Sequence, residues 1–67
     1  MQNSVRKLRM EKGLTQAALA ALAGVSRQAI IAVETCKAAP SLILAYTIAN
    51  IFGKTIEEIF FINEGAV

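Results

Sequence analysis

The sequence predicts a small all-α domain, and three observations support this fold class. Apolar residues recur at helical spacing in five segments of the 67-residue chain. Gly13, Gly24, Pro40 and Gly53 stand between these segments, where helices commonly stop or start. Hydrophobic residues make up 55% of the chain, yet no apolar run approaches the roughly 20 residues of a membrane-spanning helix. We therefore expect one soluble domain over residues 1–67.

The first predicted helix covers residues 4–12. Val5 and Leu8 fall on one side of it, as expected for a helix that packs one face against a core. Gly13 ends this helix because glycine readily leaves the helical conformation at a C-terminus.

The second and third predicted helices, residues 15–23 and 26–35, are joined by a very short turn. Thr15 and Ser26 open them, since a hydroxyl oxygen accepts the free N–H groups of a first turn. Gly24 takes the left-handed conformation that residues with a Cβ resist. Packing between the two helices is expected to fix their angle through small or apolar residues, namely Leu19, Ala20, Val25, Ile30 and Val33.

The fourth predicted helix covers residues 41–52, and the fifth covers residues 55–60. Thr55 and Glu58 have the spacing of a capping box, which favours a helix start at that point. The tail from residue 60 has no helical stop signal and is expected to form a short extended segment or to lie along a neighbour. The inward stripe of the fourth helix is predicted to contain Leu42, Ala45, Ile48, Ala49 and Phe52.

The first turn of the third helix presents Ser26, Arg27 and Gln28 together. A hydroxyl, a guanidinium and an amide are groups that bind phosphates and base edges of nucleic acids. Residues 1–40 carry a net charge of +4, whereas residues 41–67 carry −2. This asymmetry predicts that one face of the domain meets a polyanion such as DNA.

The composition excludes several other classes of function. The chain has no histidine and one cysteine, Cys36, so neither a metal site nor an internal disulfide is expected. It lacks a nucleophile with an adjacent base and a phosphate-binding glycine loop, so we expect no enzyme activity and no cofactor. No small-molecule ligand or membrane partner is indicated. The charged N-terminus lacks the features of a secretory signal, which predicts a cytoplasmic protein.

The segment LRMEKGLTQAALAALAGVSRQAI, followed by VE and PSL, resembles the Xre-type helix-turn-helix regulators, the group that includes phage Cro and repressor domains. The resemblance covers nearly the whole chain and implies a compact five-helix, lambda-repressor-like DNA-binding domain. It also implies a transcription regulator that binds operator DNA as a homodimer.

The resemblance implies roles for individual residues. Gln16 is expected to brace the DNA backbone and the recognition helix, and Lys37 is expected to contact phosphate. Arg9 and Glu34 occupy positions that commonly form a structural salt bridge. Together with the residue-level argument, this gives the predicted DNA-binding set: Thr15, Gln16, Ser26, Arg27, Gln28, Ile31 and Lys37.

The chain departs from the family pattern at the end of the recognition helix and in its middle. Thr35 and Cys36 stand where Asn-Gly is common, so this helix has to end without glycine. Ile31 and Ala32 stand where polar residues are usual, which predicts apolar base contacts such as contact with a thymine methyl.

Two functional interpretations remain open at this stage. The first is a repressor that binds a palindromic operator as a homodimer, with the dimer held by apolar residues of the C-terminal part: Ile43, Leu44, Ile59, Phe60, Phe61 and Ile62. The second is an antitoxin or protein-interaction module in which the same fold binds a partner protein.

Overall fold

The computed structural model describes residues 2–61 and confirms the all-α fold class with five helices. The helices are α1 (Val5–Glu11), α2 (Gln16–Ala23), α3 (Arg27–Glu34), α4 (Leu42–Phe52) and α5 (Ile56–Ile59). Two short strands, β1 (Gln2–Asn3) and β2 (Phe60–Phe61), lie at the two ends of the described chain.

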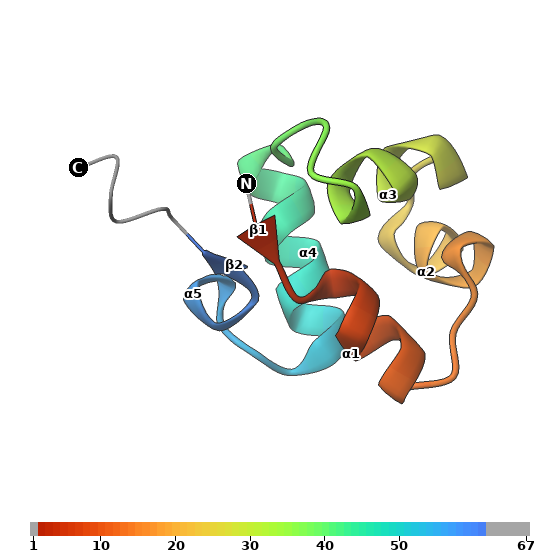
Figure 1. Cartoon of the computed structure of the whole chain (residues 1–67). Helices are drawn as coiled ribbons and strands as arrows, with labels where there is room; N and C mark the ends of the chain where they lie inside the picture. Colours follow the sequence, from red (N-terminus) through yellow and green to blue (C-terminus); the bar gives the residue numbers. More distant parts are fainter. Residues whose placement is uncertain (1, 62–67) are drawn as a thin grey trace.

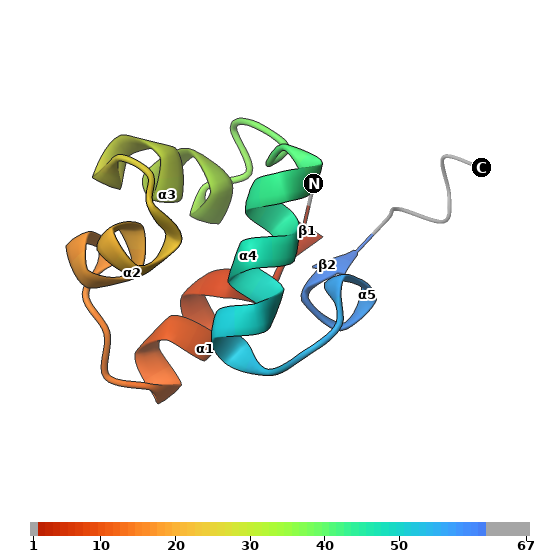
Figure 2. The ribbon, with the colours of Figure 1, turned by 180° about the vertical axis from the view of Figure 1, so that it is seen from behind.

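Helix α4 lies in the middle of the domain (Figure 1). The α2–α3 pair lies on one side of it, and α5 with the strand pair lies on the other; Figure 2 shows the same order from behind. The α2–α3 pair and α5 thus lie on opposite sides of α4, and Asn3 of β1 reaches α3 through a hydrogen bond to the Val33 carbonyl.

The core is formed by apolar side chains from all five helices and from β2. Leu19, Ile30 and Val33 are buried between α2 and α3, as the sequence predicted, and small Ala20 is buried beside them. Val25 packs against this cluster from the turn. Burial of each large apolar side chain contributes about 1.5–3 kcal/mol, so the angle between these helices is set by the core itself. The other buried residues are Val5, Ala45, Ile48, Ala49, Phe52, Ile59 and Phe60.

One residue of the predicted inward stripe of α4 is not in the core. Leu42 is 77% exposed, whereas Ala45, Ile48, Ala49 and Phe52 are buried as expected. Leu42 is the first residue of α4, and the buried stripe of the helix begins one turn later, at Ala45.

The N-terminal strand was not predicted from the sequence. Gln2 pairs antiparallel with Phe61, and Asn3 pairs with Phe60. The Ser4 N–H then donates to the Ile59 carbonyl at 2.9 Å. The extended segment expected at the start of the tail is thus β2, and it pairs with the chain's own N-terminus.

The position of α5 and β2 corrects part of the predicted dimer contact. Ile59 and Phe60 are 0% and 6% exposed within a single chain, because the start of α1 and the strand β1 cover them. They belong to the core and are not available to a second copy. Phe61 is 44% exposed, and Ile62 lies outside the described residues.

The capping box at α5 is confirmed. The Thr55 N–H donates to Glu58 Oε1 at 2.9 Å, and the Glu58 N–H donates to Thr55 Oγ1 at 3.2 Å. The hydrogen bond from the Thr55 backbone, followed by that from its hydroxyl, lowers the pKa of Glu58 below its ordinary value, and Lys54 adds to this effect.

Helix α3 ends through a left-handed residue although it has no glycine there. Cys36 has φ +61°, similar to the +72° of Gly24 at the end of α2. Its N–H donates to the Val33 carbonyl at 3.1 Å, and the Lys37 N–H donates to the Ala32 carbonyl at 3.0 Å. This pair of hydrogen bonds is the Schellman motif, so Cys36 occupies a position that glycine normally fills.

Replacing Cys36 by glycine is therefore expected to stabilise the protein. A Cβ in the left-handed region costs about 1–2 kcal/mol, and the greater freedom of glycine in the unfolded chain offsets about half of this. We predict that Cys36→Gly raises the free energy of unfolding by about 0.5–1 kcal/mol relative to Cys36→Ala, measured by urea denaturation. A glycine variant no more stable than the alanine variant would contradict this account of the helix end.

Among residues 2–61, no single helix has both the length and the hydropathy of a membrane span. Only α2 and α3 taken together pass that test, and they form a pair bent by 110°. Within the same range, no group of three or more histidine, cysteine, aspartate or glutamate side chains is placed to hold a metal ion.

Candidate nucleic-acid interface

Helices α2 and α3 form the geometric centre of the candidate site. They meet at 110° across a turn of three residues, and each begins with a hydroxyl cap. Thr15 Oγ1 accepts from the Ala18 N–H at 3.0 Å, and Ser26 Oγ accepts from the Ala29 N–H at 3.2 Å. These caps fix where each helix starts, and the apolar side chains buried between α2 and α3 fix the angle between the two helices.

Helix α3 buries one side and presents the other to solvent. Ile30 and Val33 are in the core, whereas Arg27 and Gln28 are exposed in the first turn. Ile31 is half-buried and follows Arg27 by one helical turn, so it lies on the same side of α3. The outward surface of α3 thus combines one cation, one amide and one partly covered aliphatic side chain.

The beginnings of α2 and α3 converge on a surface depression of about 470 Å³. Thr15, Gln16 and Ala17 contribute the start of α2, and Arg27 contributes the start of α3. Arg9 of α1 completes the lining. The first N–H groups of a helix have no intrahelical partner, and with the helix dipole they attract anions. Together with the guanidinium of Arg27, this depression has the chemistry of an anion site.

The carboxylate of Glu34, the last residue of α3, joins three parts of the domain. Arg9 Nε donates to Glu34 Oε2 at 2.6 Å, and Arg9 Nη2 donates to Oε1 at 3.2 Å. Gln16 Nε2 donates to the same Oε1 at 3.2 Å. The side chains of Glu34 and Arg9 are only 3% and 11% exposed. The two residues are therefore in direct contact, as the sequence analysis expected, and Gln16 is held in the same network.

Arg9 also connects this network to the loop before α2. Its Nη1 donates to the Leu14 carbonyl at 2.7 Å, so one guanidinium contacts both the entry to α2 and the end of α3. The position of the α2 N-terminus relative to α3 depends on charged hydrogen bonds as well as on apolar packing.

Lys37 lies beyond the opposite end of α3 from Arg27. It is exposed, and its backbone N–H forms one of the two hydrogen bonds of the Schellman motif. An eight-residue helix is about 12 Å long, so the two cations stand on either side of the exposed surface of α3. The structure thus groups Thr15, Gln16 and Arg27 around one depression and places Lys37 apart from them.

Sequence reasoning missed one residue that contacts α3. Asn3 Nδ2 donates to the Val33 carbonyl at 2.9 Å, and Asn3 Oδ1 accepts from the Val5 N–H at 3.1 Å. An asparagine shortly before a helix was a signal for the second contact, because its side chain caps helix starts well. No local pattern signals the first contact, which joins residues 30 positions apart.

The fold and the arrangement of α2 and α3 define a helix-turn-helix domain. The chain belongs to the helix-turn-helix family HTH_3, whose profile matches residues 5–59. The resemblance noted from the sequence is thereby confirmed, and with it the class of DNA-binding transcriptional regulators.

Relatives of nearly the same length support this membership. The chain is 49% identical over 65 residues to an uncharacterized HTH-type transcriptional regulator of Methanothermobacter thermautotrophicus, covering 96% of this chain and 94% of that protein. It is 52% identical over 60 residues to one of Methanocaldococcus jannaschii, covering 90% and 91%. A Bacillus subtilis protein of the same description is 38% identical over 64 residues, covering 96% and 97%.

The fold is also similar to a solved structure. The restriction-modification controller protein C.AhdI of Aeromonas hydrophila superposes with a TM-score of 0.76 at 34% sequence identity. The match covers 84% of this chain and 85% of that one. It supports the five-helix arrangement.

We predict that Glu34→Ala destabilises the fold by about 2–4 kcal/mol, because Arg9 would keep its buried position without its counter-charge. Thermal unfolding measures this effect, with Glu57→Ala on the exposed side of α5 as the control that also removes one carboxylate. DNA affinity is expected to fall with stability, since the end of α3 loses its anchor. An unchanged melting temperature together with reduced affinity would show that Glu34 acts on DNA and not on the fold.

Proposed function

We propose that this protein is a sequence-specific repressor that binds a palindromic operator as a homodimer. In this proposal, α3 of each copy enters the major groove, and the two copies occupy successive grooves about 34 Å apart. The observation that carries the proposal is the exposed first turn of α3, whose Arg27 also lines the depression at the start of α2. Base-reading and phosphate-binding groups thus share one surface. Such a repressor acts in the cytoplasm by occupying a promoter.

The depression at the start of α2 is proposed to receive a backbone phosphate. The free N–H groups of the first turn, Thr15 and the Arg27 guanidinium supply donors around it. Gln16 uses one N–H of its amide on Glu34 and keeps a second N–H for a phosphate oxygen. Gln16 therefore links the DNA backbone to the carboxylate that anchors α3, which agrees with its expected bracing role.

Base reading is assigned to Gln28, with Ile31 contacting a thymine methyl group. An amide pairs with adenine through two hydrogen bonds in the major groove, and an aliphatic group recognises thymine. Ser26 and Arg27 are proposed to orient this turn on the phosphates. The short outward surface of α3 leaves room for few direct base contacts, so DNA shape contributes to the choice of operator as well.

We predict that Gln28→Ala weakens operator binding by about 1–3 kcal/mol and relaxes the base preference at one position of each half-site. Selection of bound fragments from random DNA first identifies the operator. Affinity for that operator and for a scrambled duplex is then measured for both proteins. Equal losses on the two duplexes would remove Gln28 from the base-reading set.

Lys37→Ala serves as the contrasting variant for this experiment. A phosphate contact adds to binding of all sequences, so its loss is expected to weaken both duplexes alike and to reduce the salt slope by about one. An unchanged salt slope would remove Lys37 from the phosphate contacts.

The proposed dimer contact uses the exposed apolar face of α4 together with β2. Leu42, Ile43 and Tyr46 are 77%, 79% and 60% exposed, and Phe61 is also exposed. Leu44 is half-buried against the core and contributes at the border of this face. A domain of this size gains from covering such residues, and twofold symmetry lets the same face cover itself.

We predict that the wild type sediments as a dimer at micromolar concentration and that an Ile43→Asp, Tyr46→Asp double variant sediments as a monomer. Each half-site supplies too little energy alone, so the monomer is expected to lose tight operator binding. Met10→Asp, which places a charge on an equally exposed apolar position of α1, serves as the control and is expected to remain dimeric. A monomeric wild type, or a double variant that stays dimeric, would contradict this interface.

The same α4 face also supports a second candidate function, an antitoxin or protein-interaction module. Three exposed apolar side chains on one helix suit a different protein as well as a second copy. A monomeric wild type that lacks salt-dependent binding to any selected duplex would favour this candidate over the repressor.

A further inference from the structure

A side chain outside the matched helix-turn-helix region holds the end of α3. Asn3 belongs to β1 and precedes residues 5–59, which the family profile covers. Its amide nitrogen donates to the Val33 carbonyl, and its amide oxygen accepts from the Val5 N–H. Asn3 thus contacts the start of α1 and the last turn of α3 at the same time.

The Val33 carbonyl is part of the motif that ends α3. It accepts from the Cys36 N–H at 3.1 Å and from Asn3 Nδ2 at 2.9 Å, so both of its lone pairs are used. The first bond belongs to the left-handed turn at Cys36, and that turn determines where Lys37 stands. Asn3 therefore donates to the same carbonyl as the turn that carries Lys37, a proposed phosphate contact.

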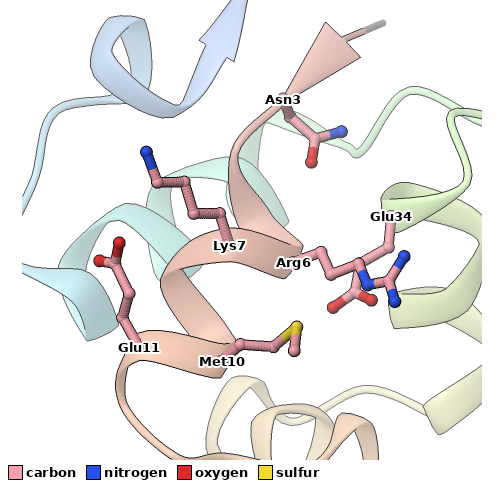
Figure 3. A pocket seen from close by; sticks show the side chains of 6 residues that line it. All are labelled: Asn3, Arg6, Lys7, Met10, Glu11 and Glu34. Carbon is pink, nitrogen blue, oxygen red and sulfur yellow. The ribbon is translucent and has the colours of Figure 1, made fainter.

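The face of α1 next to Asn3 is exposed to solvent. An open depression of about 710 Å³ lies over the exposed face of α1, lined by Arg6, Lys7, Met10 and Glu11 of that helix, by Asn3, and on the α3 side by Glu34 (Figure 3). Met10 is 60% exposed there, so apolar packing closes little of this side. Next to it, Asn3 and the Arg9–Glu34 pair connect β1 and α1 to α3 through polar contacts.

The strand pair fixes Asn3 itself. Asn3 pairs with Phe60, whose side chain is buried, and the adjoining Ser4 N–H donates to the Ile59 carbonyl. The backbone of Asn3 is thus anchored to the core through β2, and its side chain has a defined direction toward α3. A contact made from an anchored backbone loses little further entropy when it forms.

We propose that Asn3 is a positioning residue that sets the C-terminal end of α3 and the 35–37 turn for DNA binding. This inference rests on the proposed function, and it adds the N-terminal strand to the machinery that orients the recognition helix. Loss of the Asn3–Val33 hydrogen bond leaves the end of α3 held by its own turn, by Glu34 and by the buried side chain of Val33.

Asn3→Asp separates the two contacts of this side chain. The carboxylate still accepts from the Val5 N–H but has no N–H to donate and faces the Val33 carbonyl with a second oxygen. Gln2→Glu is the matched control, because it adds the same charge at the neighbouring exposed position of β1. Asn3→Ala removes both contacts and shows the combined effect.

Two measurements are made on the full-length protein. Amide hydrogen exchange of Cys36 and Lys37 in the free protein is expected to be about 3- to 10-fold faster in Asn3→Asp than in Gln2→Glu. Affinity for the selected operator and for a scrambled duplex is expected to fall together, by about 3- to 10-fold more in Asn3→Asp than in Gln2→Glu, because Lys37 in this turn is a proposed phosphate contact. A variant that merely unfolds more easily would speed exchange across the whole core, including Leu19 and Ile48.

Exchange at Cys36 and Lys37 that matches the control would overturn the inference, as would affinities for the two duplexes that fall no further in Asn3→Asp than in Gln2→Glu. If the wild type binds no duplex specifically, the proposed function fails. The exchange comparison in free protein then still decides whether Asn3 holds the end of α3.

Discussion

The relative arrangement of the first three helices depends on the carboxylate of Glu34. It accepts hydrogen bonds from Arg9 of α1 and Gln16 of α2 while standing on the last residue of α3. A buried ion pair adds little net stability, because desolvation offsets most of its attraction. The hydrogen bonds of Glu34 are directional, however, and they select one arrangement of the helices among those that apolar packing allows. Apolar burial supplies the stability of the α2–α3 pair, and this network orients the pair relative to α1.

The two ends of the described chain complete the domain in a way that the helices alone would not. Residues 2–3 and 60–61 form a small antiparallel pair, and α5 and β2 thereby become part of the core. With Ile59 and Phe60 buried in this way, the α4 surface around Ile43 and Tyr46 is the main exposed apolar face of the described chain. The proposed interface with DNA lies on α2 and α3, whereas the exposed apolar face lies on α4, which packs against α2.

Much of this architecture follows from local signals in the sequence. Hydroxyl caps at Thr15 and Ser26, the glycine at position 24 and the capping box at Thr55 each act within a few residues, so their outcomes were predictable. The Arg9–Glu34 contact was expected only through family resemblance. The β1–β2 pairing, the contact of Asn3 with Val33 and the burial of Ile59 and Phe60 depend on segments far apart in the chain. No periodicity or capping rule reports on such contacts, and this is why the predicted dimer surface included two core residues.

The brevity of α3 has a consequence for how much sequence information one copy of this chain can hold. A helix of eight residues, about 12 Å long, runs beside only about four base pairs at about 3.4 Å each. A given four-base-pair word recurs by chance about once in every 256 base pairs, which leaves a great many equivalent words in any chromosome. Binding to one promoter in preference to others then requires a second four-base-pair sequence at a fixed distance, or a local DNA shape that most matching sequences lack. One copy of the domain therefore reads few base pairs, and selectivity depends on how two such short sequences are combined in one binding site.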